Sequence, residues 1–167
     1  MHTLRDLFVH ELKDAYDAEN RLVSALPKLV AAATASDLRE AFEEHLEETR
    51  SHVRRLDQIF NALGESPLGE KCDAMEGLIR ECEEIITAPG DPAVKDAALI
   101  ACAQKIEHYE IALYGTVASY AKHLDLRDAQ DLLHQCLTEE KEADKKLTKM
   151  AEGSMTTTGI NKEARKR

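Results

Sequence analysis

The sequence predicts an all-α protein in which four long helices pack as an antiparallel bundle. Apolar residues recur at alternating spacings of three and four along four long stretches, which is the period of a helix with one buried face. Helix breakers are scarce, with 7 Gly and 4 Pro among 167 residues, so only a few turns are expected. No stretch alternates polar and apolar residues with a period of two over a useful length, which argues against strands.

The first long helix is expected over residues 4–33. Thr3, followed three residues later by Asp6, predicts an N-terminal cap with an acidic residue in the first turn. The expected inward positions alternate in steps of four and three, as in the seam of a helix bundle. They are Phe8, Leu12, Ala15, Glu19, Leu22, Leu26 and Leu29.

The second long helix is expected over residues 36–63, with Thr34 or Ser36 as its cap and Gly64 as its C-terminal stop. Because only a short connection separates it from the first helix, the two form a hairpin. Its expected inward positions are Phe42, Leu46, Thr49, Val53, Leu56, Phe60 and Leu63.

A longer connection follows and carries a short amphipathic helix, expected over residues 75–87. Asp91 and Pro92 predict the N-cap and the first residue of a third long helix over 92–123. A fourth long helix is expected over 125–151. The inward positions of these two helices are Leu99, Ala103, Ile106, Glu110, Leu113, Val117 and Tyr120, and then Leu133, Leu137, Glu140, Asp144 and Leu147. Two hairpins joined by one long crossover with a fifth, short helix form the topology of a ferritin-like bundle.

We expect the bundle to occupy residues 1–152 and a flexible basic tail to occupy 153–167. The net charge of −10 argues against a nucleic-acid backbone as the main partner, although the basic residues of 162–167 leave binding through the tail as a weaker alternative. The four cysteines form no CxxC pair. Neither a signal peptide nor a membrane-length apolar run is found, so we expect a cytoplasmic protein with free thiols and no membrane partner.

The two hairpins align with one another at an offset of 91 residues, the separation of Glu19 and Glu110. At the same offset Glu48 falls on Glu139, and leucines of the inward stripes coincide. Helix periodicity explains matching leucines but does not require an acid in the middle of a stripe. The match therefore indicates an internal duplication of the hairpin, whose pseudo-twofold axis would bring equivalent acids together at the centre of the bundle.

Carboxylates in the middle of the inward stripes are the strongest functional signal. Glu19 and Glu110 would each be costly to bury unless protonated, paired or bound to a metal ion. The second and fourth long helices each add two candidate ligands four residues apart, which share a helix face. Such a set suits a centre of two divalent ions, and the alternative is a buried network of acids and basic side chains. The expected metal ligands are Glu19, Glu48, His52, Glu110, Glu140 and Asp144, with His45, Glu107 and Glu139 as secondary candidates.

Several segments carry a resemblance to a known family. They are residues 45–56 (HLEETRSHVRRL), 106–115 (IEHYEIALYG) and 139–144 (EEKEAD), together with Ala18 and Glu19. In these segments the chain resembles the YciF-like family of bacterial stress proteins, and the resemblance covers about residues 4–151. It implies a ferritin-like bundle with an extra short helix, a homodimer, and a relation in fold to rubrerythrins and manganese catalases.

The chain departs from the general di-iron pattern of ferritin-like bundles, which has one Glu on each of two helices and Glu-x-x-His on the other two. Both single acids are present. Thr49, however, stands three residues before His52, where the pattern has Glu, and Ala143 stands three residues after Glu140, where it has His. We therefore expect an asymmetric centre with His52 as its main imidazole. This departure argues against oxygen activation of the usual di-iron kind.

Two functions follow from the two interpretations of the centre. In the first, the protein holds two divalent ions, Fe or Mn in preference to Zn, and acts on peroxide or oxygen or oxidises Fe(II) during stress. In the second, it is a non-catalytic, dimeric helical stress protein whose site is degenerate and free of metal. The sequence leaves this choice open and assigns no catalytic residue.

Overall fold

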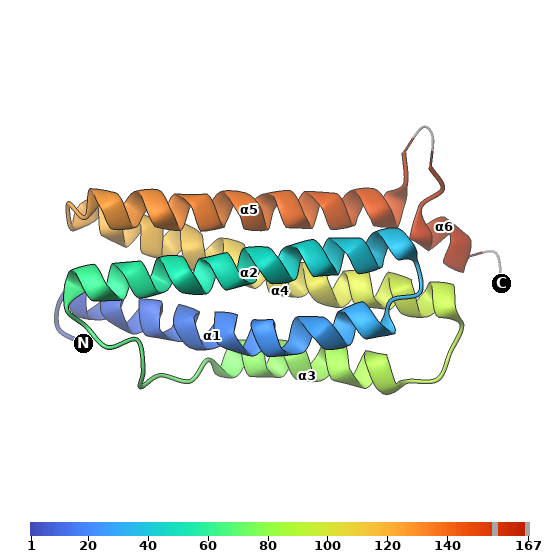
Figure 1. The fold of residues 1–167 in the computed structure, drawn as a ribbon, viewed down its shortest axis with the longest axis horizontal. Helices are drawn as coiled ribbons and strands as arrows, with labels where there is room; N and C mark the ends of the chain where they lie inside the picture. Colours follow the sequence, from blue (N-terminus) through green and yellow to red (C-terminus); the bar gives the residue numbers. More distant parts are fainter. Residues whose placement is uncertain (155–156, 166–167) are drawn as a thin grey trace.

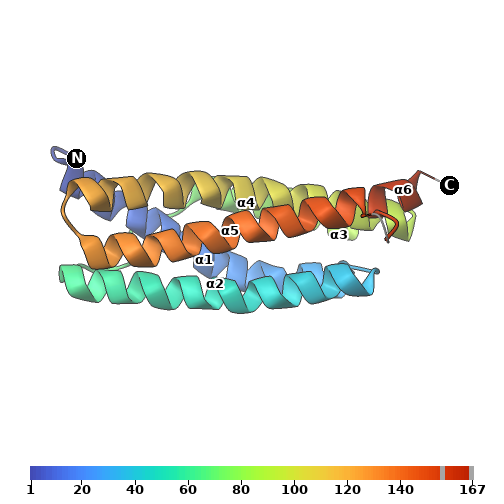
Figure 2. The ribbon, with the colours of Figure 1, turned by 90° about the horizontal axis from the view of Figure 1, so that it is seen from above.

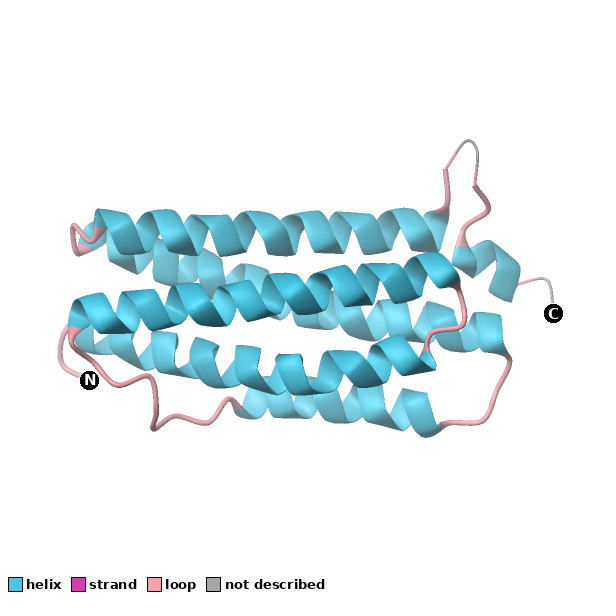
Figure 3. Ribbon diagram, in the orientation of Figure 1, coloured by secondary structure: helices cyan, strands magenta, loops and turns pink. Residues whose placement is uncertain are grey.

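A computed structural model of the chain describes residues 1–154 and 157–165 (Figure 1). Within these residues the secondary structure is helical apart from one isolated bridge between Gly153 and Thr158, and Figure 3 shows no strand in the described part. The helices are α1 (Leu4–Ala32), α2 (Ser36–Leu63), α3 (Asp73–Thr87), α4 (Pro92–His123), α5 (Arg127–Glu152) and α6 (Ile160–Ala164). The prediction of an all-α fold is confirmed.

The four long helices α1, α2, α4 and α5 form one bundle. The pairs in contact are α1 with α2, α4 with α5, α2 with α5, and α1 with α4, and the chain direction in Figure 1 makes each of these pairs antiparallel. Helix α3 lies in the crossover and packs on the outside of α1 and α4. Seen from above in Figure 2, α5 lies between α4 and α2 along most of its length. This is the ferritin-like arrangement expected from the sequence.

Most helix ends follow from local signals in the sequence. Thr3 caps α1 in a capping box, with its side chain accepting from the backbone N–H of Asp6 while the Asp6 side chain accepts from the Thr3 backbone. Gly64 ends α2 with a φ of 68°, a conformation that costs glycine little. Asp91 caps α4 and Pro92 is its first residue. These three predictions are confirmed.

The predicted cap of α2 is wrong. The N-cap position is Ala35, which has no side chain that can accept a hydrogen bond. The buried carboxylate of Asp96, from the first turns of α4, accepts from the backbone N–H groups of Thr34 and Ala35 instead, both at 2.8 Å. A residue 61 positions away from the turn therefore supplies the cap, which the local sequence could not reveal.

The core consists of apolar layers on either side of a polar middle. One apolar cluster fills the end of the bundle near the start of α1, and another fills the end near the start of α2. A third lies beneath α3. Representative members are Phe8, Leu12, Leu56 and Phe60 in the first, Leu29, Phe42, Leu99 and Leu147 in the second, and Leu22, Met75 and Ile106 in the third. The buried acids other than Asp96, and the two buried histidines, lie between the two end clusters.

The segment after α5, for which we expect a flexible basic tail, contains a short helix. Helix α6 packs against α4 and α5, and Ile160 joins the apolar cluster at that end of the bundle. A Cβ at Gly159 would lie 2.3 Å from the carbonyl carbon of Glu152, so only glycine permits this close return of the chain. One isoleucine among polar residues is the physical reason for the docking. Residues 155–156 and 166–167 of the expected tail lie outside the described residues.

Among the described residues, no helix combines the length and the apolar composition needed to cross a membrane.

Candidate metal centre

Six buried ionisable side chains from four helices meet in the middle of the bundle. Helices α2 and α4 each contribute two of these side chains, and α1 and α5 contribute one each. The two on α4 are one turn apart and the two histidines of α2 are two turns apart, so each pair shares a helix face. None is more than 6% exposed. They are Glu19 of α1, His45 and His52 of α2, Glu107 and Glu110 of α4, and Glu140 of α5.

These side chains form two overlapping groups that share one residue. The first, which we term the His52 cluster, consists of Glu19, His52 and Glu140. The second, the His45 cluster, consists of His45, Glu107, Glu110 and Glu140. In each cluster every residue offers one ligand atom, and these atoms lie within 4.8 Å of one another. Glu140 belongs to both, so its two oxygens stand between the two groups.

The His52 cluster is held together by direct contacts. Nδ1 of His52 lies 3.2 Å from Oε1 of Glu19 and 2.9 Å from Oε1 of Glu140. Its other ring nitrogen, Nε2, lies 2.8 Å from Oε2 of Glu139. The hydroxyl of Tyr114 donates to Oε1 of Glu19, and its ring meets His52 edge-on at 5.7 Å between centroids. Each ring nitrogen of His52 thus has at least one carboxylate partner.

Arg55 extends this network towards solvent. Its guanidinium donates to both oxygens of Glu139, at 2.5 and 2.8 Å. Partial burial opposes ionisation of Glu139, but the hydrogen bonds from His52 and Arg55 outweigh it and lower the pKa of this carboxyl to about 2. Burial likewise disfavours the charged imidazole of His52, yet the negative charge of Glu19 and the hydrogen bonds to acidic neighbours raise its pKa. The His52 end therefore carries its own compensating charges.

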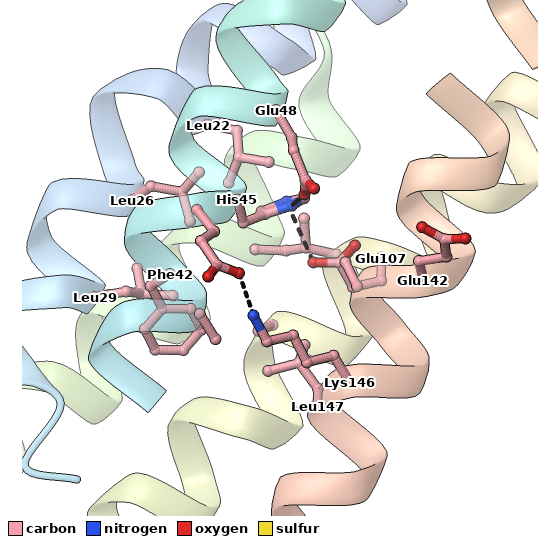
Figure 4. Close-up of a pocket in the computed structure, with 15 residues that line it drawn as sticks. Leu22, Leu26, Leu29, Phe42, His45, Glu48, Glu107, Glu142, Lys146 and Leu147 are labelled. Atoms are coloured by element: carbon pink, nitrogen blue, oxygen red, sulfur yellow. Dashed lines mark hydrogen bonds and ion pairs between the residues drawn. The ribbon is translucent and has the colours of Figure 1, made fainter. Parts of the chain in front are cut away.

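The His45 cluster has longer contacts. Nε2 of His45 lies 3.3 Å from Oε1 of Glu107 and 3.9 Å from Oε2 of Glu140, and Figure 4 shows His45 and Glu107 facing one another. Nδ1 of His45 lies 3.4 Å from Oε2 of Glu48, which sits near the surface. Burial lowers the pKa of His45, but the charge of Glu107, the hydrogen bond to Glu48 and the charge of Glu140 together raise it to about 9.

Several buried atoms of the centre have no hydrogen-bond partner within the described part of the chain. Both carboxyl oxygens of Glu110 are among them, together with Oε2 of Glu19 and Oε2 of Glu107. Oε1 of Glu140 and Nε2 of His45 make no hydrogen bond of good geometry either, but each has an ion-pair contact, at 2.9 Å with Nδ1 of His52 and at 3.3 Å with Oε1 of Glu107. Burial and the charge of neighbouring acids raise the pKa of Glu107 and of Glu110 well above the usual range for a carboxyl group. A buried carboxyl with no partner is costly, and either a proton or a cation bound between such oxygens relieves that cost.

The structure brings together four of the six main ligands expected from the sequence, namely Glu19, His52, Glu110 and Glu140. Glu48 lies beside the centre, with a side chain that is 43% exposed and that contacts His45. Asp144 belongs to neither cluster. It accepts a hydrogen bond from Gln104 and lies 3.5 Å from His108.

Among the secondary candidates, His45 and Glu107 are members of a cluster, whereas Glu139 pairs with Arg55 and contacts His52 from outside. Two buried imidazoles, those of His45 and His52, reach the centre, and the expectation that His52 is the main one stays a prediction. A signal for His45 exists in the sequence: it lies two turns before His52, on the same helix face.

The buried face of α2 explains these differences. It runs through Phe42, His45, Thr49, His52 and Leu56, whereas Leu46 and Val53 of the expected stripe are only half-buried. Thr49 donates from Oγ1 to the backbone carbonyl of His45 at 2.8 Å, so it is satisfied within its own helix. A face that contains two histidines and a threonine looks polar in sequence. The sequence pattern therefore places the buried face on the apolar neighbours Leu46 and Val53 instead.

Comparison with known proteins agrees with this fold and with the resemblance noted in the sequence. A family model described as a domain of unknown function, DUF892, matches residues 3–163. Protein YciF of Escherichia coli K12 is 46% identical over 163 residues, which span 97% of this chain and 98% of that protein. The crystal structure of the E. coli stress protein YciF superposes with a TM-score of 0.89 at 43% identity and covers 100% of both chains.

A more distant structure supports the ferritin-like fold alone. It is a dodecameric thioferritin, the bacterioferritin-related protein of Bacteroides fragilis, with a TM-score of 0.67 and 19% identity, covering 87% of this chain and 84% of that one. From the family model and the extent of the match to YciF, the chain belongs to the DUF892 family of YciF-like proteins.

Proposed function

We propose that this protein holds two divalent metal ions, Fe or Mn, in the middle of its bundle, and that the loaded centre reacts with peroxide or oxygen or oxidises Fe(II) during stress. The main support is that the His52 and His45 clusters share Glu140, while both oxygens of Glu110 are buried without a partner among the described residues. Two adjoining cations would account for both observations, since each would neutralise one cluster and Glu140 would face both.

Each cluster has its own ligands in this proposal. Glu19, His52 and Glu140 hold the ion of the His52 cluster. The ion of the His45 cluster is held by His45, Glu107, Glu110 and Glu140. Carboxylates outnumber imidazoles in both sets, which favours the harder ions Mn(II) and Fe(II) over Zn(II). When bound, such ions supply one-electron redox chemistry at a site from which bulk water is excluded.

The surrounding residues orient the ligands and control their protons. The Tyr114 hydroxyl, by donating to Glu19, fixes the direction of that carboxylate. Glu48, close to Nδ1 of His45, orients the second imidazole so that Nε2 points into the cluster. Glu139 would do the same for His52, backed by Arg55. The apolar clusters at either end keep the site dry, which strengthens its electrostatic interactions.

Metal analysis of protein expressed in iron- and manganese-supplemented medium tests the proposal. Two ions per chain are expected, and adding Mn(II), or Fe(II) without oxygen, to metal-free protein should raise its melting temperature. The double variant Glu19→Ala with Glu110→Ala should lose both the metal and the rise. Protein that carries no metal, and whose melting temperature responds to neither ion, would sink the proposal.

The alternative is a non-catalytic stress protein whose centre is a buried network of charges. The contacts of His52 favour it, because both ring nitrogens of that imidazole meet carboxylates, those of Glu19, Glu139 and Glu140. Under this alternative the melting temperature of the unmodified protein does not respond to metal, and the double variant melts at the same temperature or higher, because two buried acids have been removed. Whether the protein is a homodimer and whether it is cytoplasmic stay predictions, which sedimentation and cell fractionation would test. Nucleic-acid binding through the tail also stays an untested alternative.

A further inference from the structure

A cavity of about 170 Å³ opens beside the His45 cluster, between the four helices of the bundle (Figure 4). Most of its wall is apolar. Figure 4 shows Leu22, Leu26 and Leu29 of α1 on one side and Leu147 of α5 on another. The remaining apolar lining residues are Ala41, Phe42, Ala103, Ile106 and Ala143.

The inner end of the cavity is polar and incompletely hydrogen-bonded. His45 and Glu107 line it, with Nε2 of His45 in an ion-pair contact of 3.3 Å with Oε1 of Glu107, and the other oxygen, Oε2 of Glu107, is buried without a hydrogen-bond partner in the described part of the chain. A neutral hydroxyl group carries one donor and two acceptor sites, so it can serve a carboxylate oxygen and a ring N–H at the same time. The cavity is therefore shaped for a molecule with an apolar body and one polar end.

The mouth of the cavity is charged. Glu44, Glu48 and Glu142 line it together with Lys146, which forms an ion pair with Glu44 across α2 and α5. Three acids against one base leave this rim negative, as is the chain as a whole with its net charge of −10. A negative rim repels anions at short range, so a free carboxylate or phosphate is disfavoured as the occupant.

We propose that this cavity binds a small neutral organic molecule with a hydrocarbon body and a single hydroxyl or hydroperoxyl end, which reaches His45 and Glu107. An apolar cavity of about 150 Å³ holds one benzene, so six non-hydrogen atoms are a suitable size for this one. As an assignment of substrate class the inference rests on the proposed function, since it places the polar end of the molecule at the metal ligands. The binding event itself needs no metal.

Titration with tert-butanol, which has five non-hydrogen atoms and one hydroxyl, tests the binding. The methyl groups of metal-free protein, kept in chelator, are followed by NMR. Saturable shifts confined to the methyls that line the cavity, those of Leu22, Leu26, Leu29 and Leu147 among them, are expected. Pivalate, which has the same hydrocarbon body but carries a carboxylate, should bind at least tenfold more weakly because of the negative rim.

A matched pair of variants on α2 locates the site. Ala41→Leu fills the cavity and should abolish the shifts, whereas Ala62→Leu adds the same side chain to an exposed position and should leave them unchanged. Ala143→Leu fills the cavity from α5 and provides a second blocking variant. Because it lies on another helix, the test still works if Ala41→Leu fails to fold. Shifts that do not saturate, or that survive both blocking variants, would overturn the inference.

The outcome is separable from that of the metal proposal. Saturable tert-butanol binding by a protein that takes up no metal would support the cavity and contradict the metal centre. Full metal uptake by a protein that binds no tert-butanol would support the centre and contradict the cavity. Metal content is measured on Ala41→Leu as well, where it should equal that of the unmodified protein.

Discussion

The two clusters of the centre share Glu140 but differ in how their atoms are satisfied. In the His52 cluster each ring nitrogen lies within 3.2 Å of a carboxylate oxygen, and Tyr114 donates to Glu19. In the His45 cluster the ring nitrogens lie 3.3 Å and 3.4 Å from the nearest carboxylate oxygens, and both oxygens of Glu110 have no hydrogen-bond partner among the described residues. Only the second cluster borders the cavity.

This difference gives each of the two functional hypotheses a separate physical basis. Opposite charges that compensate one another, as around His52, can stay buried in a folded chain without a metal ion, because removing one partner costs more than keeping the pair. Unpartnered carboxyls, as at Glu110, favour a chain that binds protons or cations there. The two ends of one centre therefore need separate experiments, because a result at one end does not decide the other.

The largest effect is expected on removing the imidazole that compensates buried acids. His52→Ala leaves Glu19 and Glu140 buried without their cation, which should lower the free energy of unfolding of the metal-free protein by about 3–5 kcal/mol. His45→Ala should cost less, because its contacts are longer and water can enter from the cavity. Urea unfolding in chelator compares the two. Equal losses of unfolding free energy in the two variants would contradict the claim that His52 compensates buried charge more strongly than His45 does.

A second pair of substitutions should give effects of opposite sign. Glu110→Leu removes a buried carboxyl without partners, which should raise the stability of the metal-free protein by about 1–3 kcal/mol. Glu19→Leu should lower it, because the Tyr114 hydroxyl and the imidazole of His52 lose their acceptor. Under the metal proposal both variants lose metal. Thermal unfolding with and without Mn(II) measures both effects, and a destabilised Glu110→Leu would contradict the account given for that residue.

The pH dependence follows from the raised pKa values of Glu107 and Glu110. Because folding raises these pKa values, the metal-free folded state holds more protons than the unfolded one, and its stability should fall as pH rises from about 4.5 through the folded pKa values. His45, whose pKa folding raises from 6.5 to about 9, adds a further loss of stability as pH rises through that interval. Metal must displace these protons, so its affinity should rise with pH, by about 1.4 kcal/mol per pH unit for each proton released. Calorimetry in buffers of different ionisation enthalpy counts the protons, and zero release would contradict this assignment.

The smallest effects are expected at Glu48 and Asp144, two ligands predicted from the sequence that lie outside the clusters. Glu48→Gln should weaken metal binding by about tenfold through the lost orientation of His45. Asp144→Asn should change it less, because Asp144 contacts Gln104 and His108 rather than the centre. Both variants should keep two ions per chain. Loss of one ion in either variant would restore that residue to the ligand set.

The fold was predictable because most of its determinants are local. The capping box at Thr3, the left-handed Gly64 and the Asp91–Pro92 start of α4 each lie within a few residues of the helix end that they specify. The cap of α2 was not predictable, since Asp96 reaches it from another helix. The docking of Ile160 likewise depends on a surface that only the assembled bundle offers.

The candidate site was predictable in part for a different reason. Spacing along a helix shows which residues share a face, but it does not give the rotation of that face towards the core. One residue corresponds to about 100° of rotation, which separates the half-exposed Glu48 from the buried Thr49. Mid-stripe acids such as Glu110 were identified because an apolar stripe surrounds them. His45 was only a secondary ligand candidate, because the expected inward stripe of this helix runs through its neighbour Leu46.

The Asp96 cap has a consequence for the centre itself. By binding the turn between α1 and α2, this residue of α4 prevents the two hairpins from sliding past each other along the bundle axis. A slip of one helical turn would be about 5.4 Å, more than the 4.8 Å that encloses the ligand atoms of each cluster. Glu110 lies about 21 Å further along α4 at 1.5 Å per residue. A carboxylate far from the candidate ligands therefore sets the axial alignment on which their meeting depends.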